Sequence, residues 1–117
     1  MHELSIAQEL IEIIKQSVSE QQWHLIKSVE IEVGAFSNVL ADSLKFCFDA
    51  TIDNTELNNV ELIIKEIPLK IKCNTCGAES IIDDFLYICP QCNDTNIIIL
   101  TGKELNINQI ELYENNQ

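Results

Sequence analysis

Arginine is missing from this 117-residue chain, and basic residues as a whole are scarce. All seven basic residues are lysines, they face 19 acidic residues, and the formal net charge is −12. Nucleic-acid binding needs a cationic surface that displaces counterions from phosphate, and anionic membrane surfaces attract the same kind of surface. The charge therefore disfavours both nucleic acid and membranes as partners.

Long apolar runs are also missing. No stretch approaches the roughly 20 residues that a bilayer-spanning helix needs. The opening Met1-His2-Glu3-Leu4-Ser5 has no basic start followed by an apolar run, so it does not resemble a signal peptide. We expect a soluble cytoplasmic protein that forms one compact unit, with at most a small appended module.

Catalytic constellations are absent as well. The only histidines are His2 and His24, and no Ser/His/Asp or Cys/His set is visible. There is no G-x-x-x-x-G-K-[ST] loop, so we do not expect the chain to hydrolyse nucleotides. Cys47 would be a nucleophile only if it were exposed with a lowered pKa, and its simplest interpretation is a small buried apolar residue. We expect no enzyme activity.

What the chain does have is two closely spaced Cys-x-x-Cys knuckles. They read Cys73-Asn-Thr-Cys76-Gly77 and Cys89-Pro-Gln-Cys92-Asn93. Each knuckle turns the chain so that two thiolates point the same way, and Gly or Asn after it tolerates the left-handed backbone at the end of a tight turn. Two facing knuckles supply four soft ligands in a tetrahedron, which predicts a zinc site.

Three other interpretations of the four cysteines compete with zinc. Disulfides need an oxidising compartment, and a thioredoxin-like redox pair has one Cys-x-x-Cys at a helix start, not two knuckles. Iron in a rubredoxin-like site is the main rival, because Cys-Pro-x-Cys suits that metal too. Four thiolates leave no open coordination position, so zinc here should be structural and not catalytic.

The first third of the chain predicts a helix and a strand. Ser5-Ile-Ala-Gln8 is typical of a capping box, and the apolar spacing behind it predicts a helix of about four turns. The apolar positions are Ala7, Leu10, Ile11, Ile14 and Val18. Strict alternation over Val29–Val33 predicts a half-buried strand that Gly34 ends. His24, beside Trp23, falls at the expected end of the helix.

A second helix and strand follow. Asp42 and Ser43 are both good N-cap types, so the helix should start near them. One face would carry Leu40, Leu44, Cys47, Phe48 and Thr51. A turn around residues 54–59 leads to a strand over residues 60–67, which Pro68 stops because it has no N–H for a ladder.

The end of the chain predicts a return strand with a defect. After Gly102, apolar residues stand at positions 105, 107, 110 and 112, so one residue is inserted into the alternation. This pattern predicts a β-bulge near Asn108 and Gln109.

Together these elements predict an α+β fold: two helices packed on a small three-stranded mixed sheet, with an inserted four-cysteine zinc module. Residues 1–68 plus 101–117 should form the α+β domain, and residues 69–100 the zinc-binding domain. A core of this size is marginal, so the metal should help to fix the insertion.

Several stretches resemble the HypA/HybF family of hydrogenase nickel-insertion proteins. These are Met1-His2-Glu3-Leu4-Ser5-Ile6-Ala7, Val33-Gly34-Ala35-Phe36-Ser37, Leu44-Lys-Phe-Cys-Phe48, and Gly102-Lys-Glu-Leu105 with Ile110-Glu111. The knuckles fall where the family has its zinc module. The likeness covers essentially the whole chain in order, and the His2-Glu3 start combined with the paired knuckles is specific.

The resemblance implies a nickel metallochaperone with a second metal site at its amino terminus. His2 would be the indispensable nickel ligand, joined by the Met1 amine and by the Glu3 amide or carboxylate. Nickel(II) favours square-planar nitrogen sets, which an amine, an amide and an imidazole in fused chelate rings can supply. Some family members use an Asp in the loop after the first strand. This chain has Leu40 there, with Asp42 two residues on.

The resemblance also implies partners. They are the GTPase HypB and the large subunit of a [NiFe]-hydrogenase, with urease maturation proteins as a further possibility, and the chain itself could be a monomer or a homodimer. The alternative hypothesis is a zinc-stapled protein–protein adaptor whose amino terminus binds no nickel.

Overall fold

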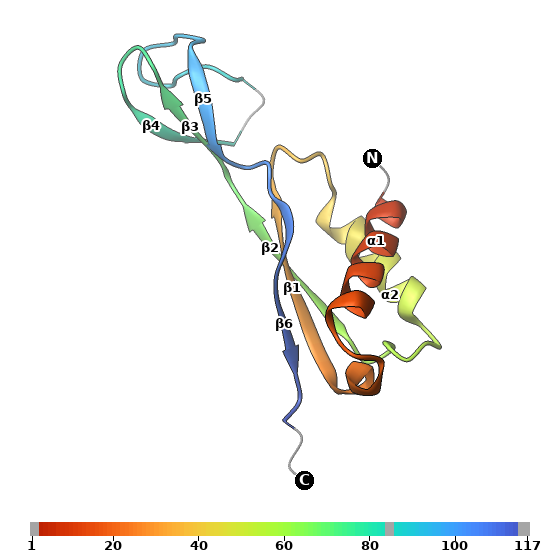
Figure 1. Cartoon of the computed structure of the whole chain (residues 1–117). Coiled ribbons are helices and arrows are strands. Elements are labelled where there is room, and N and C mark those ends of the chain that lie inside the picture. Colours follow the sequence, from red (N-terminus) through yellow and green to blue (C-terminus); the bar gives the residue numbers. More distant parts are fainter. Residues whose placement is uncertain (1–2, 84–85, 115–117) are drawn as a thin grey trace.

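The computed structural model describes residues 3–83 and 86–114 and has two three-stranded sheets joined end to end (Figure 1). The elements, in chain order, are α1 (Glu3–Ser17), the 3₁₀ helix η1 (Glu20–Leu25), β1 (Ile26–Gly34), α2 (Ala41–Ile52), β2 (Glu61–Ile67), β3 (Leu69–Cys73), β4 (Glu79–Ile82), β5 (Ile97–Thr101) and β6 (Leu105–Leu112). The molecule is elongated, with extents of 59 × 29 × 18 Å.

The first sheet has the order β2-β1-β6, with β1 parallel to β2 and antiparallel to β6. Both α-helices cover one face of it (Figure 1). This is the mixed sheet with two helices that the sequence predicts, and the α+β fold class is confirmed. The second sheet has the order β4-β3-β5 and is antiparallel throughout. We call β3, β4, β5 and the loops between them the four-cysteine module.

The apolar face of α1 is the one that the spacing predicts. Ile6, Ala7, Leu10, Ile11 and Ile14 are buried against the first sheet. The predicted capping box is wrong, because α1 already begins at Glu3 and Ser5 lies inside the helix. The predicted place of His24 at the end of this helix is also wrong, since His24 belongs to the separate helix η1, where it is exposed.

The second helix begins earlier than predicted. Its N-cap is Leu40, which has no capping side chain of its own, and Asp42 lies in the first turn. The main-chain N–H of Leu40 instead donates to Glu3 Oε2 at 3.2 Å. A group distant in sequence therefore takes the place of the local cap.

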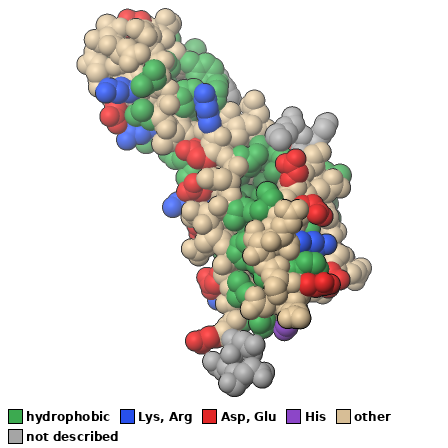
Figure 2. All heavy atoms as spheres, viewed as in Figure 1, with side chains coloured by type: hydrophobic (Ala, Val, Ile, Leu, Met, Phe, Trp, Pro, Cys, Tyr) green, Lys and Arg blue, Asp and Glu red, His purple; other side chains and the backbone are tan. Residues whose placement is uncertain are grey.

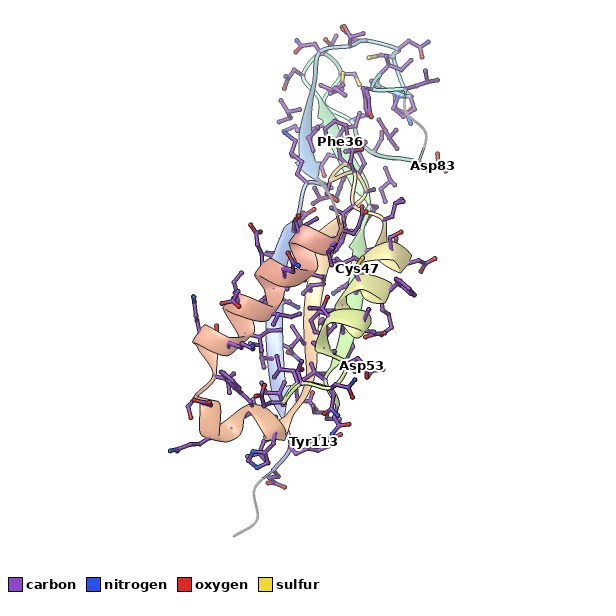
Figure 3. The ribbon with its side chains drawn as sticks, turned by 90° about the vertical axis from the view of Figure 1, so that its right-hand side faces the viewer. Phe36, Cys47, Asp53, Asp83 and Tyr113 are labelled. Atoms are coloured by element: carbon purple, nitrogen blue, oxygen red, sulfur yellow. The ribbon has the colours of Figure 1, made fainter. Side chains whose placement is uncertain are left out.

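The apolar face of α2 differs from the predicted one at two positions. Leu44 and Phe48 are buried as expected, but the side chain of Leu40 is 66% exposed. Cys47 is half-buried, not fully buried, and packs at the margin of the main core, between α2 and the sheet (Figure 3).

The β-bulge is confirmed. Glu30 pairs with Gln109, whereas the next residue, Ile31, pairs with Ile107, so Asn108 is the extra residue. The bulge keeps Ile107 and Ile110 on the side of the sheet that the helices cover, where both pack against the main core.

The two sheets meet at a tight junction. The main-chain N–H of Phe36 donates to the carbonyl of Gly102 at 2.7 Å, and that of Gly34 donates to the carbonyl of Glu104 at 2.7 Å. The Thr101 hydroxyl donates to the Pro68 carbonyl at 2.8 Å. The loop after β1 is thereby tied to the segment through which the chain leaves the module.

Phe36 is the main apolar link at this junction. Its ring lies among the strands of the module, beyond the helices (Figure 3), and packs against the small core cluster of Leu69, Ile71 and Ile82. It also meets the edge of Tyr87, with ring centroids 5.2 Å apart. A residue of the loop between β1 and α2 thus helps to fill the core of the module.

Acidic side chains are spread along the part of the surface that carries the helices. On the module, lysines and acidic side chains both lie beside hydrophobic side chains (Figure 2). Lys70 and Lys72 belong to β3, and Ile81, Ile98 and Leu100 on the flanking strands are exposed. Within the described residues, no helix is long and apolar enough to cross a bilayer.

Candidate metal centre

Each knuckle closes with a left-handed residue, as the sequence predicts. Gly77 has φ +78° and donates its N–H to the Cys73 carbonyl at 2.9 Å. Asn93 has φ +62° and donates its N–H to the Cys89 carbonyl at 2.7 Å. Both turns reverse the chain directly after the second cysteine, so that the two sulfurs of a knuckle point to the same side.

The four sulfurs meet in one cluster. The Sγ atoms of Cys73, Cys76, Cys89 and Cys92 all lie within 4.8 Å of one another. Two cross-knuckle pairs, Cys73–Cys92 and Cys76–Cys89, are each 3.6 Å apart. In a tetrahedron with zinc–sulfur bonds of about 2.3 Å, the sulfurs are about 3.8 Å apart. The cage therefore fits a tetrahedral metal ion.

The same distances argue against disulfides. A disulfide bond brings two sulfurs to about 2.05 Å, and all five cysteines are free in this structure. Cys73 and Cys89 are buried whereas Cys76 and Cys92 are exposed, so one side of the cage faces solvent. An ion could enter and leave from that side.

The thiol pKa values in the cluster indicate that a bound cation would stabilise the four thiolates. The pKa of Cys73 is lowered to about 7, chiefly because the amide of Cys76 hydrogen-bonds its sulfur, although burial opposes this. The amide of Asp94 lowers the pKa of Cys92, but burial and the three neighbouring thiols outweigh it, so that this pKa is raised. Four thiolates this close repel one another, and a bound cation would remove the repulsion.

Side chains that sequence reasoning missed join the two knuckles. The Thr75 hydroxyl donates to Asp94 Oδ2 at 2.6 Å, and the Asn74 amide donates to Asn96 Oδ1 at 3.2 Å. Thr75 and Asn74 are the two middle residues of the first knuckle. The only available sequence signal was the polar run 93–96 after the second knuckle, which is typical of turns in general.

Only some of the residues predicted for a second metal site belong to the described part of the chain. Met1 and His2 lie outside the described residues. Glu3 is half-buried at the start of α1, and its carboxylate accepts the N–H of Leu40. Asp42 is exposed in the first turn of α2, two residues beyond that contact. The structure thus brings Glu3 to the start of α2.

These features define a class of protein: a small α+β protein that carries a four-thiolate metal centre in a separate three-stranded module. The chain belongs to the HypA family. A family model described as "Hydrogenase/urease nickel incorporation, metallochaperone, hypA" matches residues 1–112.

Curated relatives agree with this assignment. The chain is 36% identical over 113 residues to the hydrogenase maturation factor HypA of Desulfatibacillum aliphaticivorans, covering 96% of this chain and 87% of the relative. It is 37% identical over 112 residues to the factor of the same name from Chloroflexus aggregans, covering 95% and 98%.

Solved structures share the fold. The solution structure of the Ni metallochaperone HypA from Helicobacter pylori superposes with a TM-score of 0.64 at 22% identity, covering 98% of this chain and all of that one. A second solution structure of a HypA protein gives a TM-score of 0.66, also at 22% identity, and covers 96% of both chains.

Proposed function

We propose that this protein binds nickel(II) at its amino terminus and delivers it during maturation of a [NiFe]-hydrogenase. The cargo ligands would be the Met1 amine, the His2 imidazole and amide, and Glu3. Such nitrogen-rich sets suit the square-planar preference of nickel(II). Membership of the HypA family supports nickel as the metal that is delivered.

The structural observation that supports this proposal is the hydrogen bond from the N–H of Leu40 to the Glu3 carboxylate. It fixes the third residue of the chain to the start of α2, at the surface, where a partner protein has access. Asp42 lies close by in sequence and is a weaker candidate for an additional ligand. A site at a chain end can exchange its ligands with those of an acceptor, which delivery requires.

For the four-cysteine cage we propose zinc in a structural role. The sulfur spacing fits zinc, and thiolate sulfur is a preferred zinc ligand. With all four positions taken by protein, the ion would have no place for a substrate or for water. We accordingly propose that the chain has no catalytic activity and that its working metal is the nickel.

The proposed division of labour follows the two sheets. Residues 1–68 plus 101–117 would be the nickel-binding domain, and residues 69–100 the zinc-binding domain. The proposed setting is the cytoplasm, and the proposed partners are the GTPase HypB and the hydrogenase large subunit. Urease maturation proteins are an alternative destination for the nickel. The acidic surface of the helical part could contribute to partner choice.

Elemental analysis of untagged protein tests the proposal. Before nickel is added, the protein should hold about one zinc per chain, and afterwards about one nickel in addition. His2→Ala should lose the nickel and keep the zinc, with an unchanged circular dichroism spectrum. His24→Ala is the matched control and should bind nickel normally.

A fusion ahead of Met1 should abolish nickel binding even with His2 intact, because it removes the free amine. Nickel that still binds such a fusion would contradict the ligand set. A native chain that takes up no nickel would favour the adaptor hypothesis.

A further inference from the structure

The second knuckle is not part of the module's sheet. Cys73 ends β3, and Asn96 directly precedes β5, but Cys89 and Cys92 lie in the segment between β4 and β5, where the described residues contain no strand. The ladder of β3 with β5 thus includes a ligand of the first knuckle, Cys73, and none of the second. Contacts outside this ladder are therefore needed to position the second knuckle relative to the first.

Asp94 makes several contacts that position the second knuckle. Asp94, two residues after Cys92, receives the Thr75 hydroxyl on Oδ2 and the N–H of Asn96 on Oδ1, at 2.6 and 3.0 Å. Its main-chain carbonyl also accepts the N–H of Cys89 at 2.9 Å. Asp94 is thus bonded to both ends of its own knuckle loop and, through Thr75, to the middle of the other knuckle.

A weaker contact runs parallel to it. The N–H of Asn74 donates to the Asn96 carbonyl at 2.9 Å, and its side-chain amide reaches Asn96 Oδ1 at 3.2 Å. Thr75–Asp94 is the shorter of the two side-chain bonds and involves a charged acceptor, which makes it the stronger link.

Charge alone would not favour a carboxylate at this place. Four thiolates around a divalent cation leave a net charge of about −2, and Asp94 adds another negative charge beside it. A hydrogen-bonding role explains the carboxylate better than an electrostatic one, since Thr75 and Asn96 satisfy both of its oxygens.

We propose that Thr75 and Asp94 form a clasp that holds the two knuckles in register and thereby slows metal release. Two sulfur pairs at 3.6 Å join one knuckle to the other, Cys73 with Cys92 and Cys76 with Cys89. A shift of one knuckle relative to the other opens both pairs at once. Thr75 and Asp94 are therefore positioning residues, and neither ligates the ion. The inference rests on the zinc occupancy proposed above for the four cysteines.

The test compares Thr75→Val with Thr75→Ser and Thr95→Val in the full-length, untagged protein. Valine keeps the size of threonine without its hydroxyl, and serine keeps the hydroxyl. Thr95 is exposed, and within the described residues its hydroxyl has no hydrogen-bond partner, so Thr95→Val is a matched control. Zinc release to an excess of a chromogenic chelator gives the rate, and cobalt(II) substitution reports the ligand set through its thiolate charge-transfer bands.

We expect Thr75→Val to release zinc about 10-fold faster or more, which is the usual effect of removing a partner outside the ligand set. Thr75→Ser and Thr95→Val should stay within about twofold of the native protein. The cobalt bands of every variant should be those of four thiolates. Equal release rates for Thr75→Val and Thr95→Val would overturn the clasp.

Asp94→Ala and the double variant Thr75→Val/Asp94→Ala keep the test decisive if one variant folds poorly. Two partners of one bond are coupled, so the double variant should release zinc no faster than Asp94→Ala alone. Effects that multiply would overturn the clasp. Native protein that bound neither zinc nor cobalt would overturn the proposed zinc site itself, a result distinct from unaltered release in the variants.

Discussion

Gly34 lies so close to the backbone of Gly102 that it has no room for a side chain, and Gly102 has no room for one because of Leu69. A β-carbon on Gly34 would lie 2.0 Å from the carbonyl oxygen of Gly102. A β-carbon on Gly102, whose φ is +119°, would lie 2.9 Å from Cα of Leu69. The two glycines let the chain pass between the sheets within hydrogen-bonding distance of the loop after β1.

Gly34→Ala should therefore lower the free energy of unfolding by about 3 kcal/mol or more, because the obstacle is backbone and cannot rotate away. Gly77→Ala is the comparison. A β-carbon on Gly77 would meet nothing within 4 Å, so the only cost is the left-handed backbone at φ +78°. The free energy of unfolding should therefore fall by about 1 kcal/mol. Urea denaturation followed by circular dichroism measures both. Equal losses would show that the junction tolerates a side chain.

Phe36→Ala should loosen the module. The ring packs against a core cluster that has three buried members among the described residues, so its loss should cost the module about 2–3 kcal/mol. The substitution should accelerate hydrogen exchange of the β3 and β5 amides more than that of the β1 amides. Phe46→Ala is the control, because Phe46 is 74% exposed and should change stability by less than about 0.5 kcal/mol. Uniformly faster exchange through both sheets would contradict a local role.

Removal of metal from the four cysteines should unfold the module and spare the helical part. Among the described residues, the module's buried cluster is Leu69, Ile71 and Ile82, whereas the main core has fifteen buried members. A module with so small a described core is expected to need a staple to offset the entropy of ordering the chain. After chelation, amides of β3–β5 should exchange freely while those of α1 and β1 stay protected. Cys92→Ser should act like chelation, and Cys47→Ser should leave the metal in place.

Metal affinity at the four cysteines should fall on acidification. The ion binds thiolates, so protons compete with it, and each thiol whose pKa lies above the working pH must release a proton on binding. The pKa values of Cys76 and Cys92 are raised, and that of Cys73 is lowered to about 7. Binding at pH 7 should release at least about two protons per ion, and more at pH 6 as Cys73 becomes protonated. Calorimetry in two buffers of different ionisation enthalpy measures this number. A value near zero, or tighter binding at pH 6, would contradict the thiolate site.

Loss of the Glu3 carboxylate should alter the start of α2. Glu3→Ala leaves the N–H of Leu40 without its partner, so exchange of that amide should become faster. Both groups have access to solvent, so overall stability should change by less than about 1 kcal/mol. Glu9→Ala, an exposed α1 residue, is the control. An unchanged Leu40 amide would show that the contact does not persist in solution.

Local chemistry in the sequence was enough for several features. The spacing of apolar residues gave the buried face of α1, and the shift between Ile107 and Ile110 gave the bulge, because both depend only on the period of the element. The Gly and Asn after the knuckles gave the left-handed turns. The predicted start of α2 was wrong for the opposite reason, since Glu3 caps α2 from 37 residues away.

By itself, the sequence determined that this protein has two Cys-x-x-Cys turns, a mixed α+β layer and a resemblance to the HypA family, because each of these is written in short spacings. Only the tertiary structure decided which sulfurs face each other, that Thr75 meets Asp94, and that Phe36 leaves its own layer to fill the module. Those contacts join segments far apart in the chain. Their partners are chosen by packing and by available hydrogen-bonding groups, which no local pattern encodes.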